Sequence, residues 1–259
     1  MNVYVGIDVA CAKRKPLPIC FVTYAKGNLK ILPPPTNFLE RVPRGSGNIE
    51  VLNRFPFRAA AEQTARAFQW LGKQFGWKIS RIAIDAPAAP PAEGKRISEI
   101  SLRKAGLECI WTPDRSRWKE RILHSQEYLL NNGAIARLPG ANQIWMLYGF
   151  ELFKALRKIG IDEIIEVFPY SIVRSLLPSC PHKTTPEGYS LQIEAVAKAT
   201  RSTRTVLEYE LLQSVRGTRH DRLDAYMAAW VASLAPESRV SYGPRIDPND
   251  SIWVPLHSI

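Results

Sequence analysis

Apolar and polar positions alternate near the start of the chain. Over residues 3–8 one face carries only β-branched apolar side chains, and the other face ends in Asp8. A period of two is typical of a strand. Residues 19–25 and 29–32 predict two further strands, because a Gly-Asn turn separates them. The chain is therefore expected to begin with three strands joined by hairpin-like connections.

Helical and strand patterns alternate through the remainder. Residues 57–76 predict a helix rich in Ala, Gln and Arg, with Gly76 as its C-terminal stop. Further helices are expected at 96–106, 114–131, 142–158, 188–214 and 220–234, and further strands at 81–85, 107–112 and 163–168. Early antiparallel strands followed by alternating helices and strands predict a mixed α/β sheet flanked by helices.

No change of composition divides the chain. Residues 1–235 are therefore expected to form one α/β domain, with a helical insertion at about 114–160. Residues 33–56 are rich in Pro, Gly, Asn and Arg, which predicts a long basic loop. Residues 236–259 are expected to form a polar C-terminal tail.

Composition and charge narrow the choice of partners. The 259 residues are 46% hydrophobic and 23% charged, as in ordinary soluble proteins, and the start lacks a signal-peptide pattern. A cytoplasmic protein is therefore expected. A zinc site is not expected, because the four cysteines are scattered. The net charge of +11 favours a polyanionic partner, above all nucleic acid, over a generally basic surface without a ligand.

Acidic residues interrupt four otherwise apolar elements. They are Asp8 in the first strand, Asp85 after RIAI, Glu166 within EIIEVFP, and Asp221 and Asp224 on the last helix. A buried carboxylate costs several kcal/mol unless a partner compensates it. Carboxylates that converge in a cleft repel one another, and a bound divalent cation is the usual remedy. The pattern therefore indicates metal-assisted chemistry.

Each acid also has a simpler interpretation. Asp8 could bond amides at a strand end, and Asp85 could form an Asx-type turn before Pro87. Alternation alone could place Glu166 on a solvated face. Asp221 could complement the dipole at the start of the last helix. Its neighbour His220 could take part in proton transfer, but a capping or core histidine is at least as plausible.

Basic and aromatic residues cluster near position 115. Arg115, Arg117 and Arg121 offer phosphate contacts, and Trp118 offers a stacking surface. Further candidates for contacts with nucleic acid are Lys13, Arg44, Lys183 and Arg219. A solvated basic face is the alternative for each of them.

Four short motifs carry a family resemblance. GIDVA, IAIDAP, IEVFP and HDRLDAYMAAWVA, in this order, resemble the family called domain of unknown function 429, over roughly residues 3–234. Its members are predicted nucleases of the ribonuclease H-like superfamily, and HDRLDA also looks like the final helix of Holliday-junction resolvases. The resemblance implies a ribonuclease H-like fold with helical insertion.

The resemblance also assigns roles to residues. It implies that Asp8, Asp85 and Asp224, with Asp221 as a further candidate, hold Mg²⁺ or Mn²⁺. Glu166 matches the IEVFP-like motif as a further catalytic candidate, and Lys183 matches a family position that precedes Gly188.

A metal-dependent phosphodiesterase acting on nucleic acid is the expected function. Two ions held by convergent carboxylates can generate a hydroxide and stabilise the leaving oxygen of a phosphodiester. One alternative is a nucleic-acid-binding protein that has lost its activity. Another is an actin-like phosphotransferase, although the two subdomains and Gly-rich phosphate loops that such enzymes need are not found in the sequence.

Overall fold

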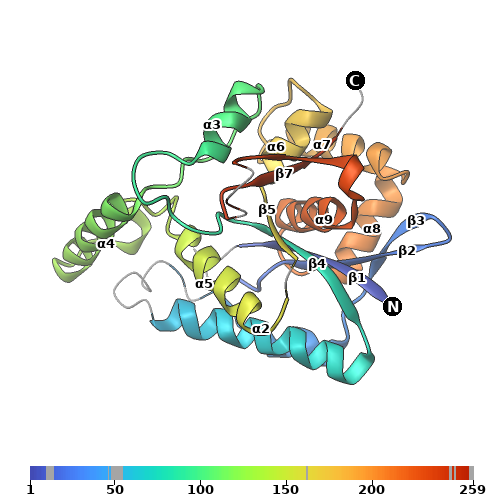
Figure 1. The fold of residues 1–259 in the computed structure, drawn as a ribbon, viewed down its shortest axis with the longest axis horizontal. Coiled ribbons are helices and arrows are strands. Elements are labelled where there is room, and N and C mark those ends of the chain that lie inside the picture. The colour runs from blue at the N-terminus through green and yellow to red at the C-terminus, as the bar shows by residue number, and fades with distance from the viewer. Residues whose placement is uncertain are drawn as a thin grey trace.

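The centre of the fold is a mixed sheet (Figure 1). A computed structural model, which describes residues 1–9, 15–45, 47, 55–161, 163–244, 247 and 249–256, builds this sheet from seven strands. In order across the sheet they are β3 (Asn28–Leu32), β2 (Ile19–Ala25), β1 (Asn2–Asp8), β4 (Lys78–Asp85), β5 (Ile164–Val167), β7 (Ile252–Pro255) and β6 (Arg239–Tyr242). The first three strands pair antiparallel, whereas β4, β5 and β7 continue the sheet in parallel from β1.

Helices cover both faces of the sheet. In chain order they are α1 (Thr36–Arg41), α2 (Phe55–Phe75), α3 (Ile97–Lys104), α4 (Arg115–Leu130), α5 (Trp145–Lys158), α6 (Pro169–Leu176), α7 (Pro186–Ala199), α8 (Arg204–Ser214) and α9 (Arg219–Ser233). Figure 1 shows α2 and α5 on one side of the sheet, α9 with α8 on the other, and α4 projecting at the edge. No helix in the described ranges has the length and hydropathy to cross a membrane. The predicted mixed α/β fold is confirmed.

The alternation of side chains along β1 explains how helices pack on both faces of the sheet. Val3, Val5 and Ile7 are fully buried in a cluster with α2 and α5. On the opposite face, a Cβ added to Gly6 would lie 2.0 Å from the carbonyl oxygen of Ala225 in α9. Only a glycine therefore lets α9 rest directly on β1. This close approach brings the N-terminal half of α9 beside the end of β1, where Asp8 stands.

The strand predicted at 107–112 is wrong. Leu107 and Cys109 are buried, but side chains instead of a neighbouring strand satisfy the backbone there. Arg103 donates to the Cys109 carbonyl at 2.6 Å, and the amide of Thr112 donates to Oε1 of Glu99 at 2.9 Å. An apolar run alone does not reveal such side-chain partners.

The segment expected to be a polar tail contributes two strands. β7 pairs in parallel with β5, so that Ile252 stands opposite Glu166, and β6 pairs antiparallel with β7. The prediction of a tail is therefore wrong for residues 239–242 and 252–255. The sequence analysis also gave no helix at 169–176, where α6 follows β5, and none at 36–41, where α1 lies in the predicted loop.

Candidate functional site

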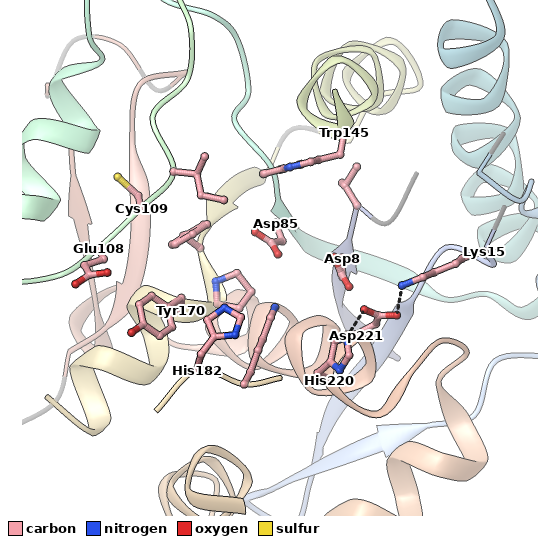
Figure 2. A pocket seen from close by; sticks show the side chains of 15 residues that line it. Asp8, Lys15, Asp85, Glu108, Cys109, Trp145, Tyr170, His182, His220 and Asp221 are labelled. Carbon is pink, nitrogen blue, oxygen red and sulfur yellow. Dashed lines mark hydrogen bonds and ion pairs between the residues drawn. The ribbon is translucent and has the colours of Figure 1, made fainter. Parts of the chain in front are cut away.

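Three aspartates converge at the ends of β1 and β4. Asp8 and Asp85 are register partners on these parallel strands, whose backbones lie about 4.8 Å apart. Asp224 precedes Ala225, the residue of α9 that packs on Gly6. Figure 2 shows Asp8 and Asp85 side by side, both turned toward a cavity. The sequence analysis predicted that these acids lie close together, and the three aspartates do.

The three carboxylates interact unfavourably. Burial raises the pKa of Asp8 well above its usual value, and the charges of Asp224 and Asp85 raise it further. Burial and the charge of Asp224 likewise raise the pKa of Asp85, to about 8. Oδ1 of Asp85 is buried and accepts no hydrogen bond from any described residue. The described surroundings therefore do not stabilise three ionised carboxylates, and in the metal-free protein the protonated forms of Asp8 and Asp85 are favoured.

Lys183 places a cation among these aspartates. Its ammonium group forms an ion pair with Oδ2 of Asp224, from the segment that precedes α7. Burial tends to lower the pKa of Lys183, but the charges of Asp224, Asp8 and Asp85 outweigh burial and raise it. The sequence analysis gave Lys183 as a contact to nucleic acid and as a match to a family position, but not as a partner of the acids. Its position among the acids makes it a direct competitor of any bound cation.

The acids supply donors of the type that a hard divalent cation prefers. Carboxylate oxygens from Asp8, Asp85 and Asp224 suit Mg²⁺ or Mn²⁺, and no described residue donates a hydrogen bond to Oδ1 of Asp85. Within the described ranges, however, no group of three or more His, Cys, Asp or Glu side chains has the arrangement of a metal site. The donor chemistry fits an ion, and ion binding requires the side chains, Lys183 included, to rearrange.

Asp221 and His220 lie at the border of the cluster. Asp221 closes a capping box with Thr218 at the start of α9 and forms an ion pair with Lys15 at 3.1 Å. Burial tends to raise the pKa of Asp221, but the hydrogen bonds from Thr218 and Lys15 outweigh it and lower the pKa. Nε2 of His220 lies 3.5 Å from Oδ1 of Asp221, and burial lowers the pKa of His220. Asp221 is thus a helix cap as well as a residue that lines the cavity.

Glu166 belongs to a different cluster. Arg96 donates to both of its oxygens, at 2.6 and 2.7 Å, and the amide of Ala88 donates to Oε2 at 3.0 Å. Burial nevertheless raises the pKa of Glu166. Because both oxygens are engaged, Glu166 holds the segment after Asp85 in place and contributes no free ligand. The solvated position considered from the sequence is wrong, since Glu166 is buried.

Residues 6–245 match the family model described as protein of unknown function (DUF429). The chain belongs to this family. No curated protein and no solved structure matched the chain. The family description states no activity, so the function of this DUF429 protein has to be inferred from its site.

The cavity at the acids has a volume of about 530 Å³. Besides Asp8, Asp85, Asp221, His220 and Lys183, its lining includes side chains that the sequence analysis of this DUF429 protein missed. These are Lys15, Glu108, Cys109, Ile110, Trp145, Phe168, Tyr170 and His182. They come from loops and helix starts far apart in the chain, and no local pattern in the sequence predicts that they meet.

Most of the basic candidates lie away from the cavity. Arg44, Arg115 and Arg117 are exposed, as is Arg121, which donates to Oε1 of Gln143. Arg219 stacks over the ring of Tyr189, with its guanidinium carbon 4.7 Å from the centroid. Lys13 lies outside the described residues of this DUF429 protein.

Trp118 does not offer a stacking surface. It is only 5% exposed, and its ring meets the edge of Phe150 with the centroids 6.0 Å apart. The stacking surface expected from the sequence is therefore wrong. The charged neighbours of Trp118 on α4 suggested an exposed position, but Trp118 is an apolar position that faces α5.

Proposed function

We propose that this protein is a metal-dependent phosphodiesterase that hydrolyses nucleic acid. The observation that carries the proposal is the convergence of Asp8, Asp85 and Asp224. Burial, together with the charges of the neighbouring acids, raises the pKa values of Asp8 and Asp85, and a buried oxygen of Asp85 has no partner among the described residues. Perturbed acids that line a cavity are typical of functional sites. Bound Mg²⁺ or Mn²⁺ would activate a water molecule and stabilise the leaving oxygen.

The order of the elements supports a ribonuclease H-like arrangement. The resemblance implies one Asp on the first strand, an acid at the end of the fourth, and acids on the last helix. Asp8 ends β1, Asp85 ends β4, and Asp224 lies on α9. In this proposal β6 and β7 extend the sheet beyond β5.

The surrounding cations are suited to a phosphate. With a divalent ion held by the aspartates, Lys183 would no longer be needed to pair with Asp224 and could contact a phosphate oxygen. Lys15, which lines the same cavity beside Asp221, offers a second positive charge. The net charge of +11 attracts a polyanion over longer distances.

His220 is the candidate for proton transfer. Because burial lowers its pKa, the ring is neutral at neutral pH and can accept a proton. Asp221, at 3.5 Å, can orient the ring and stabilise the imidazolium that forms.

One observation favours a second candidate, a nucleic-acid-binding protein without activity. The ion pair between Lys183 and Asp224 already neutralises part of the cluster, and no described group of acids has the arrangement of a metal site. In such a protein Lys183 would replace the ion permanently. The two candidates differ in what a divalent ion does to the protein.

A nuclease assay separates the two candidates. Labelled single- and double-stranded DNA and RNA are incubated with the protein in Mg²⁺, Mn²⁺ or EDTA. The proposal predicts cleavage in Mg²⁺ or Mn²⁺, no cleavage in EDTA, and no cleavage by Asp224→Asn. Glu99→Gln is the matched control, because it also removes a buried carboxyl charge but lies in the Arg96 cluster. Binding of every substrate without cleavage in either metal would overturn the proposal in favour of the inactive protein.

A further inference from the structure

The cavity has two chemically different halves. Figure 2 shows Asp8, Asp221, Lys15 and His220 toward one end of the cavity, Tyr170 and His182 with Glu108 and Cys109 toward the other, and Trp145 near Asp85 between them. The aromatic half is the part that Trp145, Tyr170 and His182 line. Trp145 comes from the start of α5, Tyr170 from the start of α6, and His182 from the segment before Lys183. The metal-dependent chemistry proposed above uses only the acidic half.

Internal bonds hold these rings in place. The indole nitrogen of Trp145 donates to the carbonyl of Asn142 at 2.8 Å, which fixes the plane of the ring. Nδ1 of His182 lies 2.9 Å from the hydroxyl of Thr184, and the centroids of His182 and Tyr170 are 6.4 Å apart. A ring that is already fixed loses little conformational entropy when a ligand stacks on it.

The rings are not part of the buried core. Trp145 and Tyr170 are only half-buried and His182 is exposed, whereas aromatic residues of the core, such as Phe21 and Phe153, are almost completely buried. An open aromatic face beside polar groups is a common feature of small-molecule sites, whose volumes run from about 300 to 1,000 Å³. The cavity volume of about 530 Å³ falls within this range.

We propose that the aromatic half binds one nucleobase, from the nucleotide whose phosphate lies at the aspartates. This inference rests on the proposed function, and it names the class of substrate. A base inside an intact duplex is paired and stacked, so it cannot enter the cavity. The preferred substrate is therefore a single strand, a strand end or an extruded nucleotide. A free nucleotide carries the same chemistry and is the second source of such a ligand.

An abasic scan of the substrate tests the inference. A set of labelled single-stranded oligonucleotides carries one abasic residue at each position in turn, and each is measured for cleavage site and for affinity beside the matched duplex. We expect the wild type to bind the single strand more tightly than the duplex. We also expect one position, next to the cleaved bond, to weaken binding by roughly 5- to 100-fold when its base is missing.

Variants identify the rings that carry the effect. Tyr170→Ala and Trp145→Ala should each weaken binding to the intact strand by roughly 5- to 100-fold and flatten the abasic scan. Tyr170→Phe keeps the ring and should stay within about twofold of the wild type, as stacking needs only the π face. Trp70→Ala is the control, because Trp70 stacks on Arg41 and does not line the cavity.

The outcomes separate this inference from the proposed function. If the wild type cleaves but its abasic scan is flat, or if it prefers the duplex, the base site is overturned and the nuclease stands. If it binds a nucleoside monophosphate but no oligonucleotide, the base site is supported and the ligand is a free nucleotide. If it binds none of these, both proposals fail. The wild-type scan decides the question even if an alanine variant does not fold.

Discussion

Two clusters of buried acids, each around one basic residue, differ in how well their members are paired. In the Arg96 cluster, Arg96 donates to both oxygens of Glu166, and its Nε lies 3.2 Å from Oδ1 of Asp250. In the aspartate cluster, Lys183 forms an ion pair with Asp224, and Oδ1 of Asp85 has no partner in the part of the chain that the structure describes. The planar guanidinium presents several directed donors, whereas an ammonium group is a compact point charge.

This contrast shows that a buried acid is not by itself a sign of function. The Arg96 cluster joins β5, the start of α3 and the C-terminal segment, since Asp250 also accepts from the amides of Ile97 and Ser98 at 2.9 and 3.2 Å. It serves the fold. Even there Oε2 of Glu99 is unpaired among the described residues, and burial raises the pKa of Glu99 to about 7. The difference is that Asp8 and Asp85 line the cavity, whereas Arg96, Glu99 and Glu166 do not.

Catalysis should show the greatest difference between the clusters. Asp8→Asn and Asp224→Asn should each reduce cleavage by several orders of magnitude, because each removes a charged ligand of the ion. Glu99→Gln should retain cleavage close to that of the wild type. The measurement is the initial rate of cleavage in Mn²⁺, normalised to the folded fraction of each variant. Equal losses in all three variants would show that the two clusters do not differ in function.

The free energy of unfolding should respond in the opposite way to catalysis, with a large loss in the Arg96 cluster and none when Asp8 of the aspartate cluster is replaced. Arg96→Met leaves Glu166 buried without its partner and should lower the free energy of unfolding by about 3–5 kcal/mol. Asp8→Asn removes repulsion, so the metal-free protein should keep or gain stability. Urea denaturation in EDTA measures both variants. A collapse of folding in Asp8→Asn would instead assign the aspartates to the fold.

Replacing Lys183 tests whether its ion pair with Asp224 takes the place of a bound metal ion. Lys183→Ala should destabilise the metal-free protein by about 1–3 kcal/mol, because Asp224 loses its partner. Mn²⁺ should recover the loss, so the metal-induced rise in melting temperature should be larger than in the wild type. Thermal melting with and without Mn²⁺ measures the effect. An unchanged response to Mn²⁺ would contradict competition between Lys183 and the ion.

The acids also predict a dependence of stability on pH. The pKa of Asp85 is about 8 in the folded protein but near 3.9 in an unfolded chain, so between these values the folded state holds a proton that the unfolded state releases. The free energy of unfolding of the metal-free protein should therefore fall as pH rises from about 4 to 8. Asp85→Asn should flatten this slope by up to about 1.4 kcal/mol per pH unit. Urea denaturation across this range is the measurement, and parallel slopes would contradict the assignment.

The weakest effect concerns the arginines outside both clusters. If Arg117 and Arg121 contact phosphates, replacing both with Ala should reduce the salt dependence of nucleic-acid binding by up to about one ion per lost contact. Lys119→Ala, on the same helix, shows whether the effect is specific. Fluorescence anisotropy across a salt series measures the slope. An unchanged slope would assign these arginines to a solvated surface.

Local patterns were sufficient to predict most of the strands and the three aspartates. The period of two placed Asp8 on the face opposite Val5 and Ile7, and the apolar stripe of the last helix placed Asp224 at its border. These predictions hold because strand and helix periods determine which side chains share a face.

Partners from distant parts of the chain could not be predicted. Arg96 lies 70 positions before Glu166, and Lys183 lies 41 positions before Asp224. The burial of Trp118 depends on the packing of α4 against α5, and the strands β6 and β7 depend on the edge that β5 offers. Only tertiary contacts determine these features, so sequence periodicity could not distinguish Glu166 from the three aspartates.

Calorimetric titration with Mn²⁺ is the sharpest test of a metal site at the aspartates, because it measures ion binding without depending on the substrate. The metal-free wild type, Asp8→Asn, Asp224→Asn and Glu99→Gln are titrated at the same pH. We expect saturable binding by the wild type and Glu99→Gln, with binding lost or weakened at least about tenfold in the two aspartate variants. Binding that is absent from the wild type, or equally strong in all four proteins, would contradict a metal site at Asp8, Asp85 and Asp224.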